Sequence, residues 1–412
     1  MAAPSNIPSA WTVAQRAKAK YDGMFGATQP PLSPKIEEQA DHFHALDQLG
    51  AMYLSRLVDH NTFSAPPNPG HYAIADFLLT KSMTIALSTN VDALIENAGD
   101  RLFGAVVTAT TRDAAAALYP EKAPLLKIHG CWKADFQNTI WAPSQLNDPA
   151  VKTRIQQCAS WATQQLVNRD LIIVGYCTDW DYINELFEEC LGAAQPSNVI
   201  VVDPGTEADL MKKAPKLFEV GGNTTGGFYH VKVSGADFLT ELRKQWSMTF
   251  VRRVFTAGNT QLENNGDPRA NRTHCEPPEA SVEYLWAMRR DMEGAGPNDP
   301  CKMSEPYEDP NLGVAHVVLR AAGAQLDGSY WELDGQRFRI IRGSGRSLND
   351  VENEHASSLS PLASPDVTIV AGARDFALKA NIARSKAESS VVRARPSRFM
   401  TDQQAESEFE LG

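Results

Sequence analysis

The chain has little that would place it in a membrane or outside the cell. No apolar run approaches the length that spans a bilayer, and residues 1–10 lack the basic start and apolar core of a signal peptide. The six cysteines are scattered and include no C-x-x-C pair, so neither a structural zinc site nor a disulfide framework is expected. We therefore expect a cytoplasmic protein in a reducing compartment, with no bound metal and no membrane partner.

Basic residues are also outnumbered. Lys and Arg total 39 against 50 Asp and Glu, which leaves a formal net charge of −11. This charge argues against a protein that binds nucleic acid directly. The composition, 43% hydrophobic and 22% charged, is that of a globular protein. Its 412 residues are enough for two domains, or for one large domain with an appendage.

Short apolar runs alternate with helical patterns over the first 250 residues. The runs do not alternate between apolar and polar positions, which is typical of strands covered on both faces in a parallel sheet. Helix spacing is seen over residues 153–167 and again over 182–191. The sequence therefore predicts an α/β fold with a parallel sheet and helices on both faces. The expected strands are residues 84–87, 105–107, 125–128, 171–174, 199–202 and 228–233.

The composition and the hydrophobic pattern of the sequence change after residue 250. Residues 258–279 are rich in Asn, Gly, Pro and charge, which is typical of a linker. Farther along, Asp334 and Gly335 separate two alternating runs and predict a β-hairpin. We expect a domain over residues 1–250, a linker over 251–280, and a smaller mixed C-terminal domain over 281–412 with a mobile tail.

Polar residues follow several of the expected strands. Thr89, Asn90 and Asp92 come after the first strand, and His129 comes after the third. The carboxyl edge of an open α/β sheet is where nucleotides bind, so these side chains are candidates for a nucleotide site. A turn built by Asn and Asp bonding their own backbone, and a core histidine, are the structural alternatives.

Four motifs in this order resemble those of Sir2-like proteins. Residues 87–97, LSTNVDALIEN, resemble their T-x-N-x-D segment, and residues 127–130, KIHG, resemble their His-Gly motif. Residues 174–181, VGYCTDWD, are similar to the glycine turn and downstream Asp of the bacterial branch, and residues 199–203, VIVVD, to the last ribose-facing strand. The resemblance covers roughly residues 8–245. It implies a Rossmann-like sheet that binds NAD and breaks the bond between nicotinamide and ribose.

The resemblance also implies roles for residues of the first two motifs. Asn90 would orient a water molecule or a ribose hydroxyl, and His129 would be the general base. Thr89 and Asp92 would fix the loop and the nicotinamide end of NAD.

The later motifs supply the other expected cofactor-binding residues. Gly175 would allow close approach of the backbone to NAD, and Tyr176 would line the pocket. Asp181 is either a ligand contact or a helix cap. Asp203 either accepts hydrogen bonds from the adenosine ribose or only starts a turn.

Two departures from the family pattern bear on function. Deacylating sirtuins carry paired zinc cysteines after the His-Gly motif, whereas here only Cys131 and Cys158 lie in that interval. The chain is therefore more similar to the zinc-free branch that hydrolyses NAD in antiviral defence. The family also opens with a strand and a glycine-rich phosphate loop, and residues 1–11 resemble the segment on the C-terminal side of that loop. We accordingly expect an N-terminally truncated domain, weakened NAD binding and a gap in the sheet.

These observations predict an NAD+ glycohydrolase that releases nicotinamide and ADP-ribose, without zinc, as an antiviral defence effector. The alternatives are a module that binds NAD or ADP-ribose without turnover and, less favoured, a protein deacylase. By resemblance we expect a homo-oligomer, with an ATPase or an Argonaute-type protein as a possible defence partner.

Overall fold

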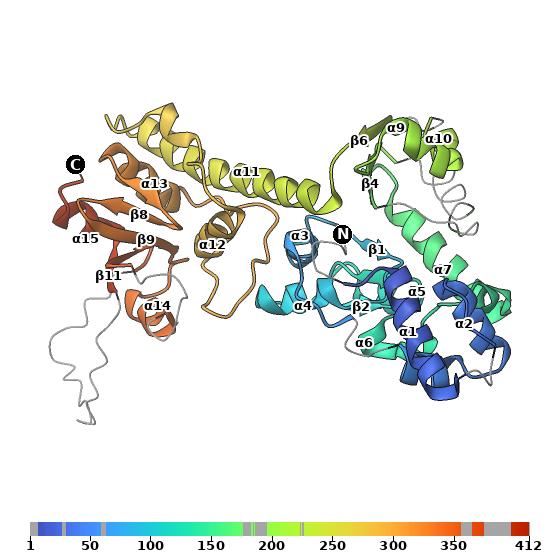
Figure 1. The fold of residues 1–412 in the computed structure, drawn as a ribbon. Coiled ribbons are helices and arrows are strands. Elements are labelled where there is room, and N and C mark those ends of the chain that lie inside the picture. The colour runs from blue at the N-terminus through green and yellow to red at the C-terminus, as the bar shows by residue number, and fades with distance from the viewer. Residues whose placement is uncertain are drawn as a thin grey trace, which may run out of the picture. The chain divides into compact units, whose positions relative to one another are not determined.

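The fold was analysed in a computed structural model. It describes residues 7–26, 30–58, 63–175, 183, 185, 196–222, 224, 226–355, 365–374 and 397–411. The chain divides into two compact units, Met1–Glu241 and Leu242–Gly412, whose elements are labelled in Figure 1.

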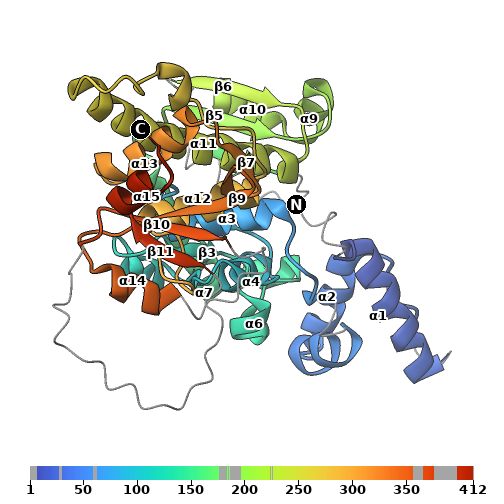
Figure 2. The same cartoon turned by 90° about the vertical axis from the view of Figure 1, so that its left-hand side faces the viewer.

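The first unit begins with a small helical bundle. It consists of α1 (Ala10–Phe25), α2 (Ile36–Ala45) and the π-helix η3 (Leu49–Leu57), and α1 and α2 lie side by side in Figure 2. Its core includes Tyr53, whose hydroxyl donates to Gln39 Oε1 over 2.9 Å. Trp132, from a later segment, packs into the same core and joins the bundle to the rest of the unit.

Within the described residues of the first unit, six parallel strands form two separate sheets. The first has the order β1-β3-β2 and the second the order β4-β5-β6, with parallel pairing throughout. Each of β1 and β4 lies at an edge of its sheet. The strands are β1 (Ala86–Ser88), β2 (Thr108–Ala109), β3 (Leu125–Lys127), β4 (Leu171–Val174), β5 (Asn198–Val202) and β6 (Gly227–Val231).

Five of the six strands overlap the apolar runs that predicted them, and the α/β class is confirmed. The exception is β2, which begins at Thr108, directly after the expected residues 105–107. Residues from both sheets share one hydrophobic core, with Leu126 and Ile128 from the first and Val199 and Val201 from the second. Adjacent residues are buried in β3 and β5, so both faces of these two strands are covered and their runs do not alternate.

Helices connect and cover these strands. The predicted helix over 153–167 is confirmed as part of α7, whose first turn is capped by Asp148 accepting from Ala150 N over 2.8 Å. The predicted helix over 182–191 lies mostly outside the described residues. The helices are α3 (Pro69–Leu79), α4 (Leu94–Arg101), α5 (Arg112–Leu118), α6 (Trp132–Asp135), η5 (Phe136–Asn138), η6 (Pro143–Asn147), α7 (Pro149–Gln165), α9 (Glu207–Lys213) and α10 (Pro215–Gly222).

Helix α11 (Gly235–Asn264) runs through the start of the segment expected as a linker. Its buried residues Val251, Val254 and Phe255 follow helix spacing. Gly258 lies against Gly313 of α13, where an added Cβ would come within 2.0 Å of the Gly313 carbonyl carbon. This glycine therefore serves close helix packing, although in the sequence it suggests a flexible segment.

The second unit contains a mixed five-stranded sheet in the order β11-β10-β9-β8-β7 (Figure 2). Pairing is antiparallel from β7 to β9 and parallel from β9 to β11. The predicted hairpin at Asp334 and Gly335 joins β8 to β9, and both residues have positive φ, of 51° and 77°. The strands are β7 (Gln325–Asp327), β8 (Tyr330–Leu333), β9 (Gln336–Arg342), β10 (Val367–Ala371) and β11 (Arg398–Thr401).

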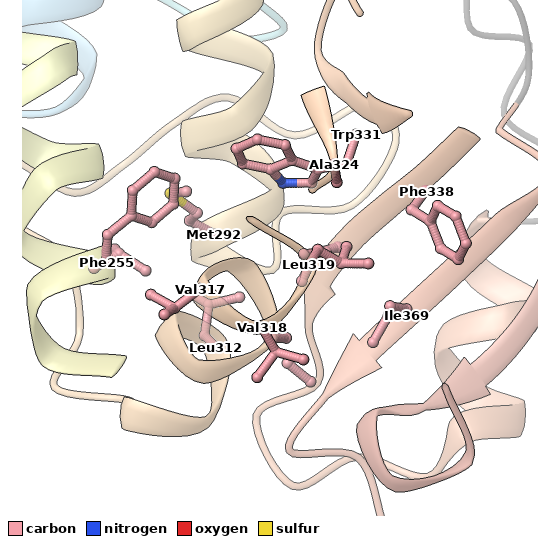
Figure 3. Packing of buried hydrophobic residues seen from close by; sticks show 14 of the residues in the cluster. Phe255, Met292, Leu312, Val317, Val318, Leu319, Ala324, Trp331, Phe338 and Ile369 are labelled. Atoms are coloured by element: carbon pink, nitrogen blue, oxygen red, sulfur yellow. The ribbon is translucent and has the colours of Figure 1, made fainter. Parts of the chain in front are cut away.

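The core of the second unit lies between this sheet and its helices. Figure 3 shows Phe255 of α11 and Leu319 of α13 on one side, with Trp331, Phe338 and Ile369 from the sheet. The helices are η7 (Arg272–Cys275), α12 (Val282–Glu293), α13 (Pro310–Ala321), α14 (Leu348–His355) and α15 (Asp402–Glu408). No helix among the described residues is long and apolar enough to cross a membrane.

Candidate functional site

The loop after β1 places Thr89 and Asn90 on the surface at the carboxyl edge of the first sheet. Both residues are exposed, and the backbone N–H of Asn90 donates to Ser88 Oγ over 3.1 Å. Asp92 is partly buried, and its Oδ1 accepts from Leu94 N over 3.1 Å at the start of α4. The Asp92 carboxylate thus supports the turn into the helix, while the Asn90 side chain is accessible to a ligand.

His129 lies in the turn that follows the neighbouring strand, β3, at the same edge. Because β1 and β3 are parallel, Ser88 pairs with Lys127, and the Ile128 amide N–H donates to the Ser88 carbonyl over 3.1 Å. Gly130 follows with a φ of +86°, and an added Cβ there would lie 3.1 Å from Thr139 Cα. Register and this glycine therefore place His129 next to the loop that carries Asn90.

The His129 imidazole is neutral at pH 7. Burial lowers the pKa of His129 to about 4, a hydrogen bond with the Thr89 backbone raises it, and the positive charge of Arg154 lowers it. The structure thus brings Thr89, Asn90 and His129 together at one edge. A neutral imidazole has a nitrogen lone pair that can accept a proton.

A buried lysine joins the two motifs from beneath. Lys127 Nζ forms an ion pair with Glu96 Oε1 at 2.6 Å, and the exposed fractions of the two side chains are only 2% and 12%. Nζ also donates to the carbonyl of Asp92, and the Thr108 hydroxyl donates to Glu96 Oε1 over 2.6 Å. Three segments, the loop after β1, α4 and β2, are therefore attached to β3.

This buried network also acts on neighbouring titratable groups. Burial raises the pKa of Asp92, whereas the Leu94 amide and the charge of Lys127 lower it. Neither Lys127 nor Glu96 is among the site residues expected from the sequence. The one available signal was a lysine within the apolar run of residues 125–128, a residue type that is almost never fully buried unless it is paired.

The second sheet carries the remaining candidates. Gly175 ends β4 with a φ of +67°, and its amide N–H donates to the Val202 carbonyl over 3.2 Å. Asp203, 7% exposed, ends β5, and its Oδ1 accepts from Gly205 N over 2.8 Å. Asp203 therefore forms a turn, which the sequence offered as the alternative to a contact with the adenosine ribose. Tyr176 and Asp181 lie outside the described residues.

The part of the chain that the structure describes has no group of three or more His, Cys, Asp or Glu placed to hold a metal ion. Cys131 and Cys158 are buried free thiols. Cys131 Sγ lies 3.7 Å from Lys127 Nζ and belongs to the buried network.

Comparison with known proteins identifies one part of the chain. Residues 84–225 match the family model described as SIR2-like domain, a range that contains β1 to β5 and ends before β6. None of the curated proteins matches the chain. SIR2-like domains typically use NAD, so an NAD-related function and NAD-dependent enzymatic activity are implied. Residues 84–225, with Asn90 and His129 at the carboxyl edge of their first sheet, thus form a SIR2-like domain.

Proposed function

We propose that the chain is an NAD+ glycohydrolase that releases nicotinamide and ADP-ribose. The observation that supports this most is the position of a neutral His129 imidazole beside the accessible Asn90 loop, held by the pairing of β1 with β3. The bond that breaks is the one between nicotinamide and C1′ of the ribose, through an oxocarbenium-like transition state as in glycoside cleavage.

In this mechanism Asn90 orients the attacking water through its side-chain amide. The water oxygen bonds to C1′, nicotinamide leaves with the electron pair of the broken bond, and His129 accepts the proton from the water. Thr89 and Asp92 hold the loop near the nicotinamide end. Asp203 and Gly175, on the second sheet, would contact the rest of the dinucleotide, with Tyr176 and Asp181.

We further propose that this activity needs no zinc and serves antiviral defence. The support is the SIR2-like match together with the resemblance to the zinc-free bacterial branch. By the same resemblance we propose a homo-oligomer that works with an ATPase or Argonaute-type partner, and residues 281–412 are the candidate region for assembly.

A second candidate function is binding of NAD or ADP-ribose without turnover. The low pKa of His129, about 4, favours it, because a general base is most effective when its pKa lies near the operating pH.

Nicotinamide release from NAD by the purified full-length chain tests these alternatives. We expect release by the wild type and a loss of about 100-fold or more in His129→Ala, with a similar loss in Asn90→Ala. The matched controls are His42→Ala and Asn147→Ala, at exposed positions of the same unit. Equal rates in the wild type and both site variants would contradict the mechanism. Binding of ADP-ribose without nicotinamide release would favour the second function, and release only with an acetylated peptide would indicate a deacylase.

A further inference from the structure

Cys131 lies in the buried network beneath the candidate site, in contact with an amine and a carboxylate. Its Sγ is 3.7 Å from Lys127 Nζ and 3.6 Å from Glu96 Oε1, and the residue is 1% exposed. Cysteines buried among apolar groups are inert, whereas a neighbouring lysine favours the reactive thiolate. The contacts of Cys131 are therefore those of a reactive cysteine, and NAD cleavage does not use it.

Glu96 is placed to accept protons from its neighbours. Its Oε1 accepts from the Lys127 ammonium, the Thr108 hydroxyl and the Cys131 thiol. Its Oε2 is buried and has no hydrogen-bond partner among the residues that the structure describes. A buried polar atom without a partner calls for a specific explanation, and a carboxylate oxygen in this state can take up a proton. A thiol, an amine and a proton acceptor thus meet at one point.

Lys127 and Cys131 belong to one short turn. Gly130 has a φ of +86°, and its amide N–H donates to the Lys127 carbonyl over 3.1 Å. This turn brings the two ends of the segment KIHGC, residues 127–131, back toward each other. A bond between the two side chains would close a ring over these five residues, so it requires no movement of one helix or strand against another.

We propose that Lys127 and Cys131 form a reversible sulfenamide cross-link when the chain reacts with hydrogen peroxide. In the first step the Cys131 sulfur attacks peroxide. The S–O bond forms, the O–O bond breaks, sulfur is oxidised by two electrons, and the second oxygen leaves as water with the thiol proton.

In the second step the Lys127 nitrogen attacks the sulfur of this sulfenic acid. The N–S bond forms and the S–O bond breaks. Of the two protons that the ammonium loses, one leaves with the hydroxyl as water and the other goes to the Glu96 carboxylate. One peroxide is consumed and two waters are released.

The cross-linked state leaves no buried charge without a partner. Loss of one member of a buried ion pair strands the other charge, whereas this reaction neutralises both Lys127 and Glu96. A thiol reductant reverses it, because the N–S bond is cleaved to the amine and the Cys131 thiol while the reductant becomes a disulfide. The cross-link does not depend on the proposed function, since no step of it involves NAD.

Peptide mapping of the full chain after peroxide treatment tests the cross-link. The folded protein is treated with hydrogen peroxide, then with catalase, alkylated and digested with trypsin. In the wild type we expect residues 123–133 as one peptide, because trypsin does not cut after a modified Lys127. This peptide should lack two hydrogens and carry no alkyl group on Cys131. Dithiothreitol before alkylation should restore both cleavage and alkylation.

Three variants separate the cross-link from other oxidation. Cys131→Ser should abolish it, whereas Cys158→Ser, the matched change at another buried thiol, should retain it. Lys127→Arg keeps a cation opposite Glu96 but has no amine nucleophile. Oxidation of Cys131 in Lys127→Arg should therefore stop at the sulfenic acid, which dimedone traps.

The proposal is overturned if peroxide leaves Cys131 of the wild type unmodified, or converts it to sulfenic or sulfinic acid with normal cleavage after Lys127. A joined peptide that persists in Cys131→Ser would also overturn it. If Lys127→Arg does not fold, fragment masses of the wild-type peptide decide, since they must place the bond between Lys127 and Cys131. Absence of nicotinamide release would contradict the proposed function and leave the cross-link intact.

Discussion

Replacing Lys127 by Met should destabilise the first sheet strongly. The side chain is 2% exposed and its ammonium lies 2.6 Å from the Glu96 carboxylate, which is itself only 12% exposed. Without the ammonium, the Glu96 carboxylate remains as a buried negative charge. The hydrogen bond that it accepts from the Thr108 hydroxyl does not neutralise this charge. Breaking one partner of a buried pair costs about 3–5 kcal/mol, and the lost bond to the Asp92 carbonyl adds to this.

Amide hydrogen exchange of residues 86–88 and 125–128, read by mass spectrometry, measures this effect locally. A loss of about 3 kcal/mol corresponds to exchange about 100-fold faster or more. This readout suits a chain with two compact units, because global unfolding of such a protein need not be a single transition.

The double variant Lys127→Met/Glu96→Gln separates the ion pair from simple loss of packing. The double variant removes both charges. We therefore expect its loss of unfolding free energy to be smaller than the summed losses of the two single variants, by at least about 1 kcal/mol. Lys133→Met is the control, since Lys133 is exposed and such surface changes stay within about 0.5 kcal/mol. Strictly additive single effects, or a Lys127→Met loss below about 1 kcal/mol, would refute the buried-pair reasoning.

Four further predictions concern pH, packing and metal. Nicotinamide release should stay level above pH 6 and fall only near pH 4, where His129 is protonated; a decline centred on pH 6.5 in a pH–rate profile would contradict this. His316 accepts from Trp331 Nε1, and burial lowers its pKa from 6.5 to about 3. The unfolded chain therefore binds a proton that the folded chain does not, and urea midpoints should fall as pH drops from 6.5 toward 3. Gly313→Leu should lower the stability of the second unit by about 1–3 kcal/mol or more in urea unfolding, because the added carbons meet the α11 backbone at Gly258. Overnight EDTA should leave nicotinamide release unchanged, and a loss restored by zinc would refute a zinc-free site.

Most of the strand positions could be predicted because burial leaves a local record. Residues 199–202 form an apolar run because β5 is buried on both faces at Val201 and Val202, and β4 lies at the other clear run, residues 171–174. Asn90 and His129 could be placed at a common edge because each follows an expected strand of a parallel sheet. The pairing of β1 with β3 supports that placement.

Other features depend on which elements meet. In the sequence, Gly258 and its neighbours suggest a linker. In the structure, Gly258 of α11 contacts Gly313 of α13. The division into two sheets is likewise a matter of strand pairing, and so is the turn that engages Asp203.

The sequence by itself determined the α/β class, the positions of most strands, and the candidate residues at their carboxyl ends. It could do so because apolar periodicity and turn residues act over a few neighbouring positions. Tertiary structure alone decided that Glu96 neutralises Lys127 and that the loop after β1 meets His129. Charges that are distant in the chain acquire their partners only when the elements carrying them pack together, and burial then sets the strength of their interaction.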